Sequence, residues 1–275
     1  MKSNSVYFNL EKFIIPCIVL LTINPFNGWS QHKSLLLHRN FYKKQDSTWT
    51  LMTKEHYSYD IQGRLKSMIS FDSLNGQWLN HLKTDYQYSQ NDKEASRTEI
   101  TSEGTGQAWS APVRSAYVLD QNGRDQVSVS ELYDSASGEW KLLNKGHYMY
   151  IDDRIYQKSF VKPDTNGWKN EDQTLYNYID TLDTYLLSNE KFYNWTNDNW
   201  AIYQMTVYHY SNARQISHTE IYNTDKNTGR TKSMPDTRHI FIYNQADNLI
   251  ERIIERFNNG VWEERFRRES IWSQQ

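Results

Sequence analysis

The sequence lacks most of the features that usually reveal a protein's chemistry. Its 275 residues include one cysteine and five prolines. The cysteine, Cys17, lies inside an apolar N-terminal run, so the rest of the chain has no thiol for a disulfide, a nucleophile or a metal site. Basic and acidic residues are nearly balanced, at 31 and 33, and are mixed along the chain. This excludes the basic stripe of a nucleic-acid-binding protein.

Motifs for catalysis and cofactor binding are also missing. There is no Gly-x-Ser-x-Gly, no phosphate-binding loop and no dinucleotide-binding fingerprint. Eight histidines are spread along the chain, and no three of them have the spacing of metal ligands. His56 and His147 occupy matching repeat positions that stacking could bring about one repeat apart, but two solvated histidines are the simpler interpretation. We therefore predict no catalytic residue, no cofactor and no metal site.

The N-terminal residues 1–30 have the order of a secretory signal peptide. Lys2 and Lys12 precede an apolar run, residues 13–23, and small residues follow at Gly28 and Ser30. The run is short for a bilayer span, which needs about 20 apolar residues. The alternative is an uncleaved N-terminal anchor. We expect a mature chain without a transmembrane segment, exported to the periplasm, the outer-membrane surface or the medium.

Aromatic residues are abundant, although the mean hydropathy is only −0.86. They make up 15% of the chain, and tryptophan returns about every thirty residues, usually followed eight residues later by Tyr-x-Tyr. A fixed period of this size is typical of repeat architectures. The repeat aromatics, which we predict to be structural, are Trp49, Tyr57, Tyr59, Trp78, Tyr86, Tyr88, Trp109, Tyr117, Trp140, Tyr148, Tyr150, Trp168, Tyr176, Tyr178, Trp200, Tyr208, Tyr210 and Trp262.

Each unit reads as two β-strands and two turns. From Trp49 to Tyr57 and Tyr59 the spacing is even, and even spacing along a strand places all three rings on one face. Residues 60–64 then form a turn in which Gly63 supplies a left-handed conformation. Pro112 falls inside an expected strand, so that strand should begin late or contain a bulge.

These units define the expected domain organisation. Residues 1–30 are the signal peptide, 31–48 a capping half-unit and 49–275 the repeat array. The units begin near Trp49, Trp78, Trp109, Trp140, Trp168, Trp200, Arg230 and Trp262. The predicted fold is all-β: an antiparallel meander of about eight two-strand repeats of about thirty residues, forming a curved or coiled sheet with its aromatic face turned inward.

The string Tyr-Ser-Tyr-Asp-Ile-Gln-Gly-Arg-Leu at residues 57–65 resembles the YD repeat of Rhs-type shell proteins. The wider pattern, Asn-Gly-x-Trp followed by Tyr-x-Tyr and a turn, is similar to repeats in secreted, Trp/Tyr-rich envelope proteins of the Bacteroidota. The resemblance covers roughly residues 45–272, and it implies a curved β-sheet.

A porin-like membrane barrel is the architecture we reject at this point. Its strands would need one face apolar enough for lipid. Lys54, Lys83 and Lys145 are expected mid-strand on one face, and Asn144 and Asp172 on the other. Charged and polar residues on both faces leave no lipid-facing band.

The function indicated by these features is an exported, non-enzymatic scaffold or binding module of the bacterial cell envelope. Its partner is unknown, with a glycan or an envelope protein as the open possibilities. One alternative is a carbohydrate-binding protein that uses exposed Trp and Tyr rings as stacking platforms. A second alternative is a hydrolase that its motifs do not reveal.

Overall fold

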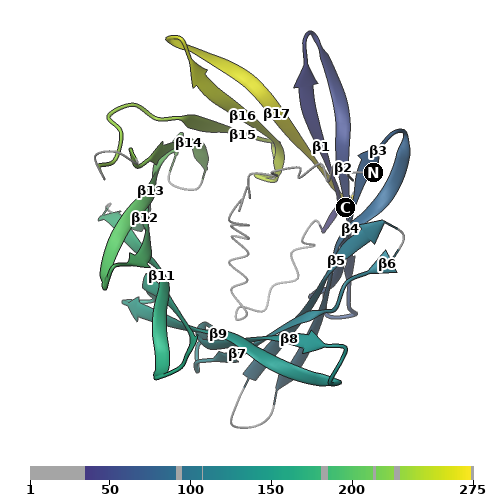
Figure 1. Ribbon diagram of the computed structural model, residues 1–275. Coiled ribbons are helices and arrows are strands. Elements are labelled where there is room, and N and C mark those ends of the chain that lie inside the picture. Colours follow the sequence, from purple (N-terminus) through teal and green to yellow (C-terminus); the bar gives the residue numbers. More distant parts are fainter. Residues whose placement is uncertain are drawn as a thin grey trace, which may run out of the picture. The chain divides into compact units, whose positions relative to one another are not determined.

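The structure is a computed structural model, and it describes residues 35–90, 95–106, 108–180, 185–212, 215–225 and 230–273. The predicted signal peptide lies outside these residues and stays a prediction. The described chain consists of β-strands joined by short turns (Figure 1). The strands are β1 Leu36–Gln45, β2 Thr48–Tyr59, β3 Leu65–Leu74, β4 Gln77–Gln90, β5 Ala95–Gly106, β6 Ala108–Trp109, β7 Val113–Leu119, β8 Asp125–Asp134, β9 Glu139–Ile151, β10 Arg154–Asp164, β11 Gly167–Asp180, β12 Tyr185–Thr196, β13 Asn199–Tyr210, β14 Ile216–Asn223, β15 Thr237–Tyr243, β16 Leu249–Asn258 and β17 Val261–Trp272.

Consecutive strands pair antiparallel, so the predicted all-β meander is confirmed. The sheet does not stay open, however, because β1 pairs with both β2 and β17. The two-residue β6 pairs only with β5, and β5 pairs directly with β7, so 16 of the 17 strands form a closed barrel. The expectation of a curved or coiled sheet is therefore wrong. The segment predicted as a capping half-unit supplies β1, the strand that completes the ring.

The turns follow the predicted residue chemistry closely. Gly63 and Gly123 have φ of 74° each, in the left-handed region that glycine tolerates. Asp60 Oδ1 accepts hydrogen bonds from the backbone N–H groups of Gln62 and Arg64, both at 2.9 Å. Pro112 ends an interruption, and β7 begins at Val113, directly after it. In the seventh unit, Thr231 makes only an isolated bridge with Thr224, and β15 starts at Thr237, well beyond Arg230.

A β-bulge recurs three residues after the repeat tryptophans. In β2, Leu51 and Thr53 oppose the adjacent residues Tyr42 and Phe41 of β1, which leaves Met52 as the extra residue. An extra residue moves every later side chain of the strand to the other face. The other bulge residues at this position are His81, Leu143, Glu171, Tyr203 and Arg265.

The bulges correct the prediction that Trp and Tyr rings share one face. Trp49 lies on the face of Tyr42, whereas Tyr57 lies on the opposite face with Phe41 and Thr53. Even spacing fails because the strand contains one residue more than its partner between the two rings. The repeat aromatics therefore form two separate sets, one on each face of the sheet.

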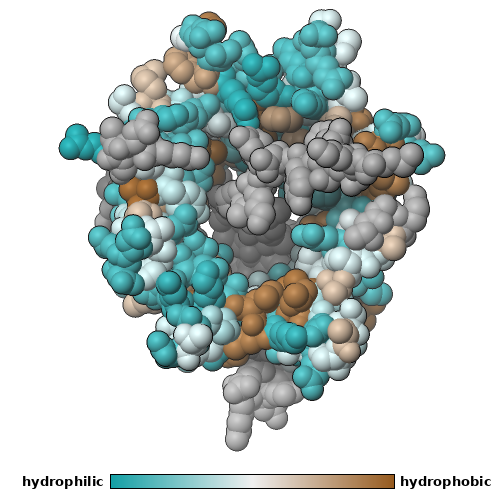
Figure 2. Space-filling model, in the orientation of Figure 1, coloured by the Kyte–Doolittle hydropathy of each residue, from teal (hydrophilic) through white to brown (hydrophobic). Residues whose placement is uncertain are grey.

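The expected dry aromatic layer is also absent from the described residues. Only Leu36 and Tyr208 among the hydrophobic residues are buried, whereas the buried polar residues include Ser70, Thr84 and Thr219. Figure 2 shows polar side chains over much of the visible surface and a hydrophobic area near β7–β9. The barrel is thus held together by its hydrogen-bonded ladders and by cross-strand side-chain pairs, and not by a large apolar core.

Candidate functional site in the barrel interior

The face that carries the Tyr-x-Tyr pairs points into the barrel. Small side chains on this face, such as Thr84, Ser128 and Thr206, are buried, as expected where a concave surface crowds side chains together. Glu99 of β5 acts electrostatically on Lys158 of β10, although β7, β8 and β9 separate their strands. Charges so far apart around the ring act on one another most readily through its interior.

The first tyrosine of each pair contributes to an inner aromatic layer. Burial raises the pKa of the Tyr57, Tyr176 and Tyr208 hydroxyls, which keeps them neutral. Tyr57 donates a 2.6 Å hydrogen bond to Glu55, and Tyr117 donates one of 3.4 Å to Glu99. The members of this layer, each on its own strand, are Tyr57, Tyr86, Tyr148, Tyr176 and Tyr208, together with Tyr117, which has no second tyrosine after it.

The second tyrosine of each pair ties neighbouring strands together. The hydroxyl of Tyr88 donates to the carbonyl oxygen of Leu65 at 2.9 Å, while the Arg64 guanidinium lies 4.4 Å from the Tyr88 ring centroid. Arg64 is itself held by Asp60, with Nε–Oδ2 at 2.7 Å. Tyr150 makes the same two contacts: its hydroxyl donates to the carbonyl oxygen of Asp125, and the Arg124 guanidinium lies over its ring. Tyr59, Tyr178 and Tyr210 make the corresponding hydrogen bonds to Leu36, Ile155 and Leu187, and Trp272 makes one to Leu249 through its indole N–H. The second tyrosines therefore stabilise the pairing of neighbouring strands.

One sector of the interior contains a buried acid and a buried base. Burial raises the pKa of the Glu190 carboxyl to about 7, and the nearby Lys158 and Tyr208 oppose that rise. Burial lowers the pKa of Lys158, whose amine lies 5.0 Å from the Phe160 ring centroid. Near neutral pH, Glu190 can therefore either donate or accept a proton in a hydrogen bond.

A second sector, near the seam between β17 and β1, is basic. Arg39 donates a 3.2 Å hydrogen bond to the Tyr57 hydroxyl, and Arg268 lies 4.0 Å from Glu55. Arg252 lies 2.6 Å from His239 Nδ1. Burial, together with the charges of Arg252 and Arg268, lowers the pKa of His239 to about 2, so this ring is neutral. The interior thus offers aromatic rings, a neutral imidazole, guanidinium groups and a titrating carboxyl.

The tryptophans occupy the outer face, where cations cover several of them. Lys54 lies 4.2 Å from the Trp78 ring centroid, and Lys145 lies 4.2 Å from that of Trp168. Trp168 is the most exposed of the outer rings among the described residues, with 46% of its surface accessible. Arg114, Arg238 and Arg267 cover Trp140, Trp262 and Trp49 in the same way.

The repeat positions of His56 and His147 allowed the two side chains to lie about one repeat apart, but the structure separates them. His56 lies on β2 opposite His38, whereas His147 lies on β9 opposite Val127, several strands away around the barrel. The two histidines therefore form no pair, and both are exposed, as the simpler interpretation expected. Sequence reasoning also missed Glu190 and Lys158, because a mid-strand acid and lysine look solvated until the curvature of the barrel is known.

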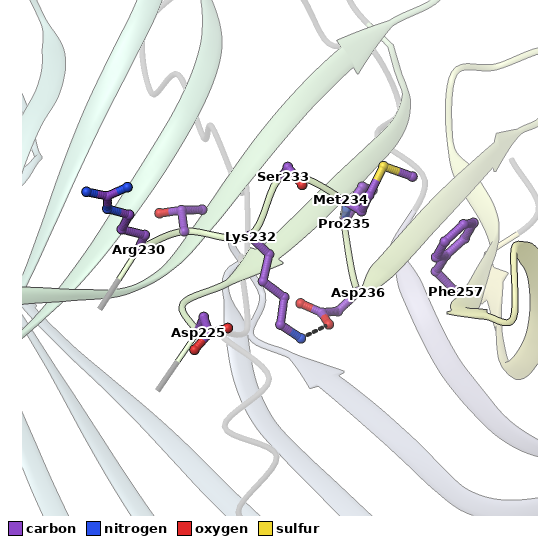
Figure 3. Close-up of a pocket in the computed structure, with 9 residues that line it drawn as sticks. Asp225, Arg230, Lys232, Ser233, Met234, Pro235, Asp236 and Phe257 are labelled. Atoms are coloured by element: carbon purple, nitrogen blue, oxygen red, sulfur yellow. Dashed lines mark hydrogen bonds and ion pairs between the residues drawn. The ribbon is translucent and has the colours of Figure 1, made fainter. Parts of the chain in front are cut away.

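A hollow of about 480 Å³ lies beside the segment before β15 (Figure 3). Lys232, Pro235, Asp236 and Phe257 contribute to its walls. The Lys232 amine forms an ion pair with Asp236 at 2.5 Å, drawn as a dashed line in Figure 3. This pairing satisfies the charges of Lys232 and Asp236, so these two side chains are not directed at a ligand.

No protein-family model and no curated protein sequence matches the chain. Among solved structures, it is similar to a porin-like protein from Bacteroides uniformis, with a TM-score of 0.49 and 9% identity over 86% of this chain and 98% of that chain. A porin-like protein from Bacteroides vulgatus gives a TM-score of 0.24 and 8% identity over 88% of this chain and 99% of that chain. A protein of unknown function from Bacteroides fragilis gives a TM-score of 0.29 and 15% identity over 59% of this chain and 93% of that chain.

The resemblance to the YD repeats of Rhs-type shell proteins is overturned. Those repeats imply a sheet that coils, whereas here β17 returns to β1 and the ring closes. The local turn motif at residues 57–65 is real, but a turn motif specifies a hairpin and not the path of the whole sheet. The closed ring also corrects our rejection of a barrel, because strand closure does not depend on the lipid-facing band on which that rejection rested. In the part of the chain that the structure describes, no helix could span a membrane.

Proposed function

We propose that this chain is a non-enzymatic binding barrel of the bacterial cell envelope, and that the inner tyrosine layer, apart from the buried Tyr208, is its ligand-contacting surface. The observation that carries the proposal is the closed ring, whose interior presents tyrosines beside Glu190 and Lys158. Rings with polar tips can stack on a ligand and hydrogen-bond to it at the same time. A ligand suited to this surface has flat faces and many hydroxyl or amide groups.

The outer face supports an aqueous location within the envelope. Lys54, Lys83 and Lys145 lie on it, and the Arg114 and Glu131 side chains form an ion pair there at 2.6 Å. The lipid-facing surface of a membrane barrel tolerates such charges poorly, at a cost of about 2–4 kcal/mol each near the bilayer midplane.

Cell fractionation tests this location. We expect the full-length chain in the envelope fraction, released by alkaline carbonate without detergent, and monodisperse in detergent-free buffer. A barrel that stays with the membrane pellet after carbonate and needs detergent to remain folded would contradict an aqueous location.

Carbohydrate binding through the outer tryptophans is the second candidate. It is favoured by one observation, the exposure of Trp168 beneath the Lys145 amine. A glycan array with the full chain, followed by tryptophan-fluorescence titration of any hit, tests both surfaces. Loss of binding in Tyr176→Ala but not in Trp168→Ala supports the inner surface, and the reverse supports the outer one. If no polysaccharide or peptidoglycan fragment binds, both the inner and the outer surface are refuted as glycan-binding sites.

A further inference from the structure

Two histidines face one another on the outer side of the hairpin formed by β13 and β14. His209 and His218 are directly paired across the strands. Their rings stack with centroids 4.2 Å apart and planes inclined by 3°. The side chain of His209 is 40% exposed, so an ion in solution can reach the pair.

A carboxylate completes the group. Glu220 lies two residues after His218, on the same face of β14, and its Oε2 is 3.3 Å from His209 Nε2. One ligand atom from each of the three residues lies within 4.8 Å of the others, and no other such group of three occurs within the described ranges. Ligand atoms around a tetrahedral zinc ion are about 3.3 Å apart, so small side-chain rotations bring all three into position.

Neighbouring hydroxyls orient these ligands. The Ser217 hydroxyl donates to the carbonyl oxygen of His209 at 3.1 Å, and its oxygen lies 3.1 Å from His218 Nδ1. Because the Ser217 proton is already used, the oxygen accepts from Nδ1–H, which leaves the Nε2 lone pair of His218 for a metal. Tyr222 donates a 2.8 Å hydrogen bond to Glu220 Oε2. Such supporting hydrogen bonds are typical of histidines and carboxylates that bind metals.

The charges around the group also suit a cation. Arg238 is paired with Glu220 in the strand register, but its guanidinium binds Glu255, with Nε–Oε2 at 2.7 Å. The Glu220 carboxylate is therefore not neutralised by this arginine.

From this geometry we propose that His209, His218 and Glu220 bind one divalent transition-metal ion, Zn²⁺ in particular. Two imidazoles with one carboxylate favour zinc over calcium or magnesium, which prefer all-oxygen sites. Three protein ligands leave a fourth position for water or for a group from a partner. The site is independent of the proposed ligand surface, because it lies on the opposite face of the sheet.

The chain contains its own control. His38 and His56 are also paired across strands, with ring centroids 4.5 Å apart, but their planes are inclined by 74° and His56 packs against Phe71. No carboxylate joins this second pair in a group of three within the described residues.

The test is a Zn²⁺ titration of the metal-stripped, full-length chain against a chromogenic chelator. We expect one Zn²⁺ per chain and at least a tenfold weaker affinity in His218→Ala and in His209→Ala, with His56→Ala unchanged. Equal loss in His56→Ala, or no stoichiometric binding by the parent chain, overturns the proposal.

Glu220→Gln provides a second test that keeps the size of the side chain and both histidines. With Co²⁺ as a spectroscopic probe, we expect the parent chain to give tetrahedral visible absorption bands that weaken and shift in Glu220→Gln. An unchanged spectrum and affinity would remove Glu220 from the ligand set and refute the three-ligand site. Circular dichroism of each variant verifies that the barrel is folded.

Discussion

The amine of Lys54 lies 4.2 Å from the ring centroid of Trp78, which belongs to the following repeat unit. The same distance separates Lys145 from Trp168, so the contact recurs with the repeat. A lysine on one hairpin thus covers the tryptophan that opens the next, and the outer face is stabilised by contacts between units.

Replacing Lys54 with Met keeps most of the aliphatic stem and removes the charge. We expect a loss of about 0.5–1 kcal/mol in the free energy of unfolding, the size of an exposed cation–π contact. Urea denaturation measures it. Lys66→Met, at an exposed lysine on β3, is the control and should change the midpoint little; equal losses at both sites would argue against the contact.

The bulge at Met52 can be tested by deletion. Removing Met52 forces either Trp49 or Tyr57 onto the wrong face, so we expect the deletion variant to lose cooperative unfolding or to fail to fold. Met52→Ala keeps the residue count and should cost about 1 kcal/mol or less because the side chain is half-exposed. Comparable stability of the two variants, measured by urea denaturation, would show that the bulge does not set the faces.

Asp120 holds its turn through hydrogen bonds to the N–H groups of Asn122 and Arg124, at 2.9 and 3.0 Å, and through an ion pair with Arg124. We expect Asp120→Ala to lower the free energy of unfolding by about 1–2 kcal/mol, from two net hydrogen bonds. Asp120→Asn retains the accepting oxygen and should recover part of the loss. Thermal unfolding compares the three proteins, and an equal loss in both variants would assign the effect to the charge.

Glu190 should make stability depend on pH. Its pKa rises from an ordinary value of 4.5 to about 7 in the folded protein, so the folded state binds the proton more tightly. The free energy of unfolding should therefore fall as pH rises from about 4.5 to 7, and then level off.

In Glu190→Gln that dependence should be reduced, as measured by urea midpoints at intervals between pH 5 and 8. Glu139→Gln, at an exposed position, serves as the matched control. If Glu190→Gln follows the parent protein across this range, the carboxyl is already ionised in the folded barrel.

Local features of the fold could be predicted from the sequence, whereas long-range ones could not. The turn at Gly63 and the late start of β7 after Pro112 follow from the conformational limits of single residues. Ring closure depends on the pairing of β1 with β17, which are far apart in sequence and have no motif in common. The bulges could not be predicted from residue type, because Met52, His81 and Glu171 have chemically different side chains. They share only their position, three residues after a repeat tryptophan.

The interior and the histidine hairpin show the same limit. Glu190 and Lys158 became a candidate site only once curvature brought their strands around a common interior. His209 and His218 could have been paired from a correct hairpin register, but their nine-residue separation is not a recognised metal-ligand spacing along one strand.

The closed ring also has a consequence for how the chain can be cut and joined. The N–H of Ser273 donates a 2.8 Å hydrogen bond to the carbonyl oxygen of Leu35, so the polypeptide returns to the place where its first strand starts. A peptide linker between these neighbours, with new termini opened at another hairpin turn, would leave every strand pairing of the barrel in place. The units of the barrel therefore have a circular order, and a circularly permuted chain that starts at a different unit should form the same barrel.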